Sequence, residues 1–309
     1  MMGSRDKSGA VRQVRSPVPH WAPYLFVAPY VIIVIAFLGY PFLQSIRLAF
    51  FQTAGTQSQV WVGWDNFRFL AQDIDFHKAL RNTVTFAFFG TVLMIPLSLG
   101  LALLLNAGKD RLKSVFRLVF FAPNVVGQIF VGIIFAVVFT PRYGIFNRFT
   151  HDIIGWGLEN RWIENPGLVM PAIVITNLWL YAGFNMIYFL AALQNVDESL
   201  QEAARIDGAG PWGVFWHVTL PQIKPVAVFV LIMSTIGSFQ LFELPYALMR
   251  GNTQPNGPAD SALFLVSYLY DSAYRFSDLG LASAAGWVLA LIILTVSLIQ
   301  LKVTGAMND

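Results

Sequence analysis

Only a few residues of this 309-residue chain have the types and the spacing that chemistry requires. The clearest is Glu243, an acid inside the apolar run 226–248, with Gln240 three residues before it and Tyr246 three residues after it. Residues three or four apart share one face of a helix, so these side chains and, less directly, Phe239 are predicted to line one surface. A charge inside a membrane is costly and normally faces the interior of a helix bundle or water.

A carboxylate, an amide, a phenol and ring edges together suit a polyol, because its hydroxyl groups need donors and acceptors. Pro245 weakens the helix and would free backbone carbonyls to line a cavity. The alternative roles for Glu243 are a structural hydrogen bond to a neighbouring helix and a place at the membrane interface. Weaker candidates for a substrate pathway are polar residues in other apolar runs, namely Asn185, Asn177, Tyr188, Asn124 and Gln128.

A second polar segment, residues 194–225, lies between two apolar runs. Its charged side chains cannot lie in hydrocarbon. Asp197 is a predicted N-cap, because free backbone N–H groups favour an acid at a helix start. A helix is predicted from about 198 to 206, and Gly208 is placed to end it with a positive φ. Pro211 is predicted to begin a second short helix, which Pro221 and Pro225 stop. The segment therefore forms a polar helix–turn–helix, called the knob below.

The chain shows no pattern of an enzyme or a metal site. It has no cysteine, its four histidines lack ligand spacing, and it contains no GxxxxGK[ST] phosphate loop. We therefore expect no catalytic residue, no metal and no cofactor in this chain. If ATP drives the protein, another chain must bind the nucleotide.

The composition indicates the elements that position these residues. The chain is 56% hydrophobic and 12% charged, which is typical of a polytopic membrane protein. Its net charge of +3 gives no argument for nucleic acid. We predict an all-α fold with six transmembrane helices. The predicted spans are about 23–48, 83–106, 116–140, 168–193, 226–248 and 280–302.

Six spans place both termini on one side of the membrane. Basic residues are dense in the polar tail 1–21 and in the short connector around 109–117, so this side is predicted to be the cytoplasm. The first span is too long for a cleaved signal peptide. The apolar run 261–276 is too short to span and is predicted to be interfacial or re-entrant on the outer side, with a seventh crossing as the alternative. Residues 22–309 thus form one membrane domain.

The knob also carries a family resemblance. Glu202-Ala203-Ala204, then Gly208, then Val218-x-Leu220-Pro221 resembles the EAA loop of binding-protein-dependent ABC importer permeases. The family usually has Ile at the position of Val218, and Asp207-Gly208 is similar to its sugar-permease branch. Other matching segments are Tyr40-Pro41, the stretch 62–67, Asn82-Thr83, Pro123 and the stretch 278–284.

The chain therefore resembles a permease subunit of the MalF/UgpA type in a carbohydrate ABC importer of type I architecture, located in the cytoplasmic membrane. The resemblance implies a second related permease, two ATPase subunits that bind ATP and Mg²⁺, and an extracytoplasmic binding protein that delivers a sugar. It also implies that the knob is a cytoplasmic coupling helix. The residues implied to contact an ATPase are Glu202, Ala203, Ala204, Asp207, Gly208, Leu220 and Pro221.

Two alternatives remain open from the sequence. The cargo of such an importer could be glycerol phosphate, a peptide or an amino acid, although Glu243 argues against an anion because like charges repel strongly in a low dielectric. The chain could instead be an ion-coupled secondary transporter with Glu243 as the proton carrier, which would leave the EAA pattern unexplained.

Overall fold

The structure is a computed structural model that describes residues 21–55, 58–107, 110–155, 157–249 and 254–305. It divides into two units, residues 1–47 and residues 48–309. The predicted polar tail 1–21 lies, apart from Trp21, outside the described residues. The first unit is one apolar helical rod made of α1 (Ala22–Val34), the π-helical turn η1 (Ile35–Gly39) and α2 (Tyr40–Leu48), whose last residue belongs to the second unit.

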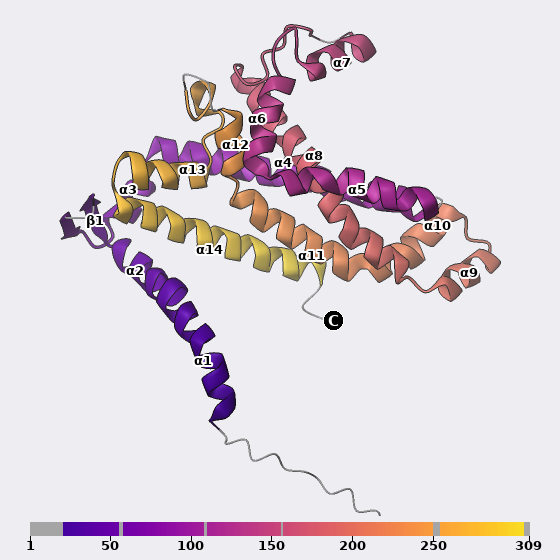
Figure 1. Ribbon diagram of the computed structural model, residues 1–309, viewed down its shortest axis with the longest axis horizontal. Helices are drawn as coiled ribbons and strands as arrows, with labels where there is room; N and C mark the ends of the chain where they lie inside the picture. Colours follow the sequence, from indigo (N-terminus) through magenta and orange to yellow (C-terminus); the bar gives the residue numbers. More distant parts are fainter. Residues whose placement is uncertain (1–20, 56–57, 108–109, 156, 250–253, 306–309) are drawn as a thin grey trace, which may run out of the picture. The chain divides into compact units, whose positions relative to one another are not determined.

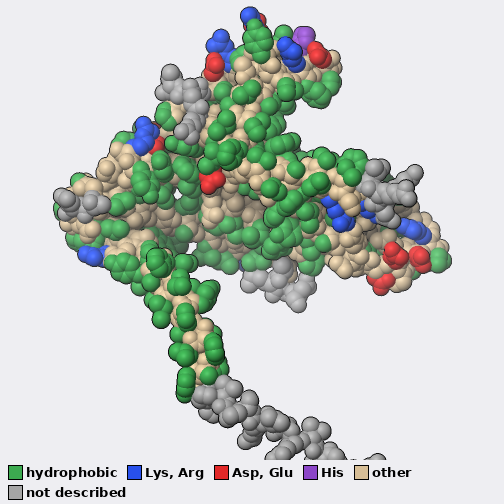
Figure 2. Space-filling model, in the orientation of Figure 1, with side chains coloured by type: hydrophobic (Ala, Val, Ile, Leu, Met, Phe, Trp, Pro, Cys, Tyr) green, Lys and Arg blue, Asp and Glu red, His purple; other side chains and the backbone are tan. Residues whose placement is uncertain are grey.

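Five long helices build the body of the second unit (Figure 1). They are α4 (Ile74–Ala107), α5 (Asp110–Val126), α8 (Pro166–Gln194), α11 (Leu220–Phe239) and α14 (Leu279–Thr304). α4 packs along α8 and α11, α5 packs on α8, and α11 packs on α14. In the face seen in Figure 2, hydrophobic side chains cover much of these helices, and most charged side chains gather near their ends. This distribution is expected of helices that lie in lipid.

Five helical stretches among the described residues are long and apolar enough to cross a membrane. They are Ala22–Leu48, Ile74–Ala107, Pro166–Gln194, Pro211–Phe239 and Leu279–Thr304. The predicted third span, 116–140, is wrong as one continuous helix. It is a pair, α5 and α6 (Gln128–Val138), bent by 101° at the break between them.

The predicted fifth span, 226–248, also differs from the structure. The helix ends at Phe239, and a separate short helix, α12, covers Glu243–Leu248. The reason is Pro245, which has no N–H to donate to the carbonyl of Leu241 and whose ring would clash with that carbonyl. The prediction that Pro221 and Pro225 stop the second knob helix is wrong, because the chain runs from α10 (Pro211–Val214) through the π-helical turn η2 (Phe215–Thr219) directly into α11.

The end of the second unit opposite the knob, called the hairpin end, carries a small β-hairpin that was not predicted (Figure 1). Strands β1 (Phe51–Ala54) and β2 (Ser58–Trp61) pair antiparallel, and the short helix α3 (Asp65–Leu70) follows. Buried Asn66 fastens this segment, because its Nδ2 donates to the carbonyl oxygens of Ala49 and Phe51 at 2.9 Å each.

Asp278 joins the same hairpin to α14. Its Oδ1 caps the helix by accepting from the N–H of Leu281 at 3.0 Å, and it also accepts from the Thr53 hydroxyl at 3.2 Å. Gly280 packs directly on the Phe51 carbonyl, where a Cβ would overlap the oxygen. Only glycine fits this approach.

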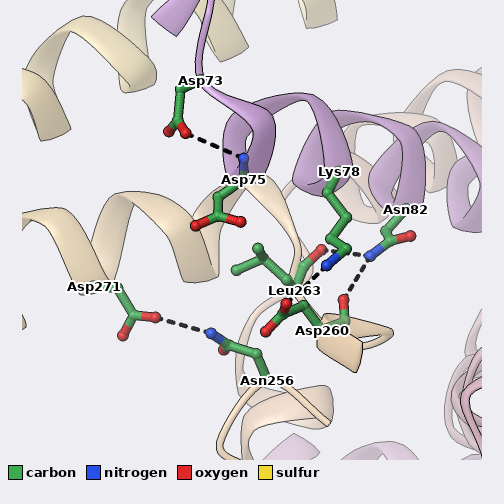
Figure 3. Close-up of polar contacts among 8 residues, drawn as sticks. All are labelled: Asp73, Asp75, Lys78, Asn82, Asn256, Asp260, Leu263 and Asp271. Atoms are coloured by element: carbon green, nitrogen blue, oxygen red, sulfur yellow. Dashed lines mark hydrogen bonds and ion pairs between the residues drawn. The ribbon is translucent and has the colours of Figure 1, made fainter. Parts of the chain in front are cut away.

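A second polar network holds the segment after α12 against the start of α4 (Figure 3). Asn82 donates from Nδ2 to the carbonyl oxygens of Asp260 and Leu263, both at 3.0 Å, and Lys78 forms an ion pair with the Asp260 carboxylate at 2.8 Å. The hydroxyl of Thr83 accepts from the N–H of Leu265 at 3.0 Å. The Asn82-Thr83 pair on α4 therefore fastens the segment 260–265 to the helix bundle.

The run 261–276 follows the 3₁₀ turn η3 (Pro258–Asp260) and contains α13 (Leu265–Tyr270) and the π-helical turn η4 (Asp271–Arg275). These helices are too short to cross a membrane. Tyr268 donates to the Asp73 carboxylate at 2.6 Å, and burial together with that carboxylate raises the pKa of the Tyr268 hydroxyl. The phenol therefore stays protonated and keeps donating.

Gly183 allows α8 to touch α5, and this contact generates a prediction. A Cβ at Gly183 would overlap the carbonyl of Phe120 on α5, whereas one at Gly100 on α4 would meet nothing within 4 Å. We expect Gly183→Ala to lower the free energy of unfolding by about 1–3 kcal/mol, the usual cost of overpacking. The matched control, Gly100→Ala, should be neutral or stabilise by up to about 1 kcal/mol. Detergent unfolding curves of the two variants measure this, and equal midpoints would contradict the close contact.

Candidate functional site

A cavity of about 290 Å³ lies among α4, α8, α11 and the two helix breaks. Its lining has no charged side chain, and Met94, Phe184, Met233 and Leu241 supply apolar surface. The polar groups are amides and hydroxyls from several elements, among them Gln128, Asn177, Tyr181, Asn185, Ser234 and Gln240. Such a lining suits an uncharged ligand that presents both hydroxyl groups and C–H faces.

Both helix breaks open at this cavity. Gly127, between α5 and α6, has φ 86° and ψ 154°, a backbone conformation that only glycine adopts without strain. At the other break, Gln240 and Leu241 follow the end of α11 and line the cavity. Non-helical backbone in a membrane is tolerated where it is buried in protein or lines a water-filled space. The breaks therefore bring the side chains of Gln128 and Gln240 to the cavity wall.

The polar groups of the cavity keep hydrogen-bonding capacity. Gln128 donates from Nε2 to the Tyr181 hydroxyl at 2.7 Å, while its Oε1 is buried and has no partner among the described residues. Asn185 makes only a long contact with Ser234, with 3.5 Å between Nδ2 and Oγ. The Asn185 amide, which lines the cavity, is therefore available to pair with a hydroxyl group of a ligand.

The structure places the predicted pathway residues in different surroundings. Gln240 and Asn185 line the cavity, as do Asn177 and Gln128 among the weaker candidates. Phe239 is buried in a hydrophobic cluster at the hairpin end and does not line the cavity.

Glu243 and Tyr246 are exposed on α12. The predicted shared face of Gln240, Glu243 and Tyr246 is wrong, because the helix stops before Gln240 and restarts at Glu243. Tyr246 instead contacts the rings of Phe242 and Tyr270.

Sequence reasoning missed Gly127, Tyr181 and Ser234 at the cavity. A signal for Tyr181 was present, because Asn177, Tyr181 and Asn185 recur every four residues and so form one polar stripe along α8. No sequence signal identified Ser234 or the extended backbone at Gly127.

The first helix of the knob is built as its sequence predicts. α9 spans Glu198–Ile206, and Asp197 caps it by accepting from the N–H of Ser199 at 2.8 Å. Gly208, with φ 86°, ends the helix in a complete Schellman motif. In this motif the N–H of Gly208 donates to the carbonyl of Arg205, and the N–H of Ala209 donates to that of Ala204. The turn is therefore held by local hydrogen bonds alone.

The knob presents a mixed acidic and apolar surface at the end of the second unit opposite the hairpin (Figure 1). Glu202, Ala203, Asp207 and Gly208 are exposed and Ala204 is half-buried, while Leu200, Ile206 and Trp212 expose large apolar side chains nearby. Leu220 is half-buried and Pro221 exposed in the first turn of α11. A cavity of about 510 Å³ separates α9 and α10 from the ends of α4 and α8. Exposed apolar residues of this kind mark a surface suited to another protein.

Comparison with known proteins identifies the nature of the chain. Residues 94–304 match the family described as "Binding-protein-dependent transport system inner membrane component". The arabinooligosaccharides transport system permease protein AraP of Bacillus subtilis is 38% identical over 92% of this chain and 89% of that protein. The lactose transport system permease protein LacF of Rhizobium radiobacter is 36% identical over 90% of this chain and 92% of that protein.

The glycerol-3-phosphate transport system permease protein UgpA of Escherichia coli is 30% identical over 91% of this chain and 93% of that protein. Among solved structures, a chain of a bacterial ABC transporter for the import of alginate has the same fold, with a TM-score of 0.80 and 24% identity over 94% of this chain and 96% of that one.

The Asp197 cap generates a prediction about the knob. Hydrogen bonds from Ser199 lower the pKa of the Asp197 carboxyl, so the charged cap stabilises α9 above the ordinary pKa of about 3.9 and is lost as the pH falls through the lower folded-state value. At neutral pH, Asp197→Ala should accelerate amide hydrogen exchange in the first turn of α9. Asp197→Asn, which keeps a capping oxygen, should exchange much more like the native chain. Hydrogen exchange mass spectrometry compares the three, and native-like exchange in the Ala variant would contradict the capping role.

Proposed function

The chain belongs to the family of binding-protein-dependent transport system inner membrane components, and from this premise we propose that it forms half of the pathway of an ABC importer for a neutral sugar or short oligosaccharide. Members of this family are multi-pass membrane proteins that act as transport subunits and not as enzymes. ATP and Mg²⁺ therefore bind to separate ATPase subunits.

The observation that carries the proposal is the uncharged, hydrogen-bonding lining of the cavity at the two helix breaks. Amides and hydroxyls there pair with sugar hydroxyls, and Phe184 packs against C–H faces. A volume of about 290 Å³ lies at the lower end of ligand pockets, roughly 300–1,000 Å³. The site therefore accepts a short saccharide or part of a longer one.

Partners complete the transport cycle in this proposal. An extracytoplasmic binding protein delivers the sugar to the hairpin end, and a second related permease supplies the other half of the pathway. The relatives' names support a saccharide, since they refer to arabinooligosaccharides and lactose. One solved neighbour is an alginate transporter in complex with a periplasmic protein that holds an alginate pentasaccharide. Both termini and the knob lie in the cytoplasm.

The knob couples the pathway to an ATPase in this proposal. Its Schellman turn fixes α9 at a defined angle, and exposed Leu200 and Ile206 offer apolar contacts beside Glu202 and Asp207. The first turn of α11, at Leu220 and Pro221, follows α10 and η2. A movement of α9 is therefore transmitted to α11, whose other end lies at the cavity.

Glycerol phosphate is the second candidate substrate, because a relative is named for it. Among the described residues, the cavity lining has no cationic side chain to bind a phosphate, and charge-assisted partners are the usual ones for that group. A neutral sugar is therefore favoured. An ion-coupled secondary transporter fits poorly with a family defined by its dependence on a binding protein.

The cavity generates the experiment that tests the substrate class. In vesicles that contain the complete importer and trapped ATP, Gln240→Leu and Asn185→Leu should each reduce sugar uptake by about five- to 150-fold, since a lost hydrogen bond and an unpaired sugar hydroxyl together cost about 1–3 kcal/mol. Thr295, exposed on α14 and outside the cavity lining, gives the control, and Thr295→Val should leave uptake unchanged. Native uptake by both cavity variants would place the pathway elsewhere.

Gly208 generates a prediction about coupling. Its φ of 86° strains any residue with a Cβ, although a Cβ there would meet nothing within 4 Å. Gly208→Ala should cost about 1 kcal/mol of local stability, whereas Gly208→Trp adds bulk on the ATPase-facing surface and should abolish sugar-stimulated ATP hydrolysis. Gly210, with φ −70°, is the control, and Gly210→Ala should keep both sugar uptake and sugar-stimulated ATP hydrolysis. Full stimulation in a well-inserted Gly208→Trp complex would exclude this surface as the coupling contact.

A further inference from the structure

Helix α7 (Ile145–Ile154) carries an apolar stripe that no other part of the described chain covers. Ile145, Phe149 and Ile153 are 73%, 60% and 65% exposed, and their spacing of four residues places them along one flank. Three large apolar side chains in a row would be unfavourable in water, since burying each one is worth about 1.5–3 kcal/mol. The stripe therefore requires a partner or an apolar medium.

The rotation of α7 is fixed by polar contacts on its inner side. Asn147 is fully buried and donates from Nδ2 to the carbonyl oxygens of Thr140 and Asn160, at 3.3 and 2.9 Å. Its Oδ1 accepts from the indole N–H of Trp162 at 2.6 Å, and Trp162 packs edge-on against Phe146. The usual pattern of a water-facing helix is thus inverted, with a polar anchor inside and apolar side chains outside. The helix cannot roll to bury the stripe.

The other exposed flank of α7 is charged. Arg148, His151 and Asp152 are exposed there, and charged and histidine side chains gather around this helix in Figure 2. At 100° per residue, Arg148 and His151 lie at least about 60° from every residue of the stripe around the helix axis, whereas Asp152 lies at the boundary beside Ile145. One flank therefore suits an acyl environment and the other suits water or lipid head groups, which is the pattern of a helix lying in a membrane interface.

We propose that α7 lies in the surface of the membrane leaflet away from the knob, with Ile145, Phe149 and Ile153 among the acyl chains and Arg148 at the head groups. The adjoining helix α6 supports this occupant. Together with α5, from which it is bent by 101°, it is long and apolar enough to cross a membrane, and its Phe130, Ile134 and Val137 form an exposed apolar ridge. The apolar surface of the span thus continues into α7 across a few residues.

A lipid surface fits the stripe better than the binding protein does. The binding protein is soluble and must leave after delivery, so its docking surface must tolerate water between visits. An aliphatic and aromatic stripe held outward by Asn147 does not meet that requirement. A lipid surface covers the stripe permanently. The anchored α7 would then fix the height of the segment 140–167, and with it the mouth of the pathway, relative to the membrane.

The absence of cysteine from the sequence allows a direct test by spin labelling. Phe149→Cys and Ile153→Cys place a nitroxide on the stripe, and Arg148→Cys places one on the charged flank as the matched control. The complete importer is reconstituted in vesicles of phosphatidylethanolamine and phosphatidylglycerol, with the unsubstituted importer as background. Collision rates are then measured with oxygen, which concentrates in lipid, and with a water-soluble nickel chelate.

We expect the ratio of oxygen to nickel collisions to be several-fold higher at positions 149 and 153 than at 148. High nickel access at 149 and 153 would place the stripe in water and overturn the proposal. Low access for both reagents would place it under a protein, such as the second permease, and would also overturn it. Because two stripe positions are tested, failure of one variant to assemble leaves the other to decide. The readout does not use transport, so it is independent of the proposed function.

Discussion

The rule that backbone polar groups must be satisfied inside hydrocarbon governs this structure. A continuous helix meets the rule with its own hydrogen bonds, so any break must be sheltered by protein or must line a cavity. The described part of the second unit has two such breaks, at Gly127 and at Gln240–Phe242, and both open on the same cavity. The breaks are thus the places where the bundle can present polar groups to a substrate without exposing them to lipid.

The hairpin end satisfies the same rule in a different way. Chain segments that are not helical there are fastened by side chains, since Asn66 and Asn82 each donate to two backbone carbonyls. Asp278 caps α14 and holds the hairpin at once, and Gly280 lets the backbones touch. Residues that resemble family motifs at this end are therefore packing anchors. They hold the chain in one position where it re-enters the helix bundle, and this position determines where the cavity and α12 lie.

The knob and α7 show two ways in which an exposed helix is fixed. The knob is held by local groups, the Asp197 cap and the Schellman turn at Gly208, so its form depends little on the rest of the fold. α7 is held by the distant contacts of Asn147 with Asn160 and Trp162. The first device suits a helix that receives force from a partner. The second suits a helix whose orientation toward a surface matters more than its own stability.

The sequence by itself determined whatever depends on neighbours along the chain. Apolar length predicted the long helices, and the cap at Asp197 with the glycine at 208 predicted α9 to the residue, because these signals act within one or two turns. Tertiary structure decided which polar residues meet. Gln240 and Asn185 come together only because α11 ends beside α8, whereas Glu243 is turned outward on a new helix. The direction of the chain after a break depends on packing between distant segments, and no local pattern encodes it.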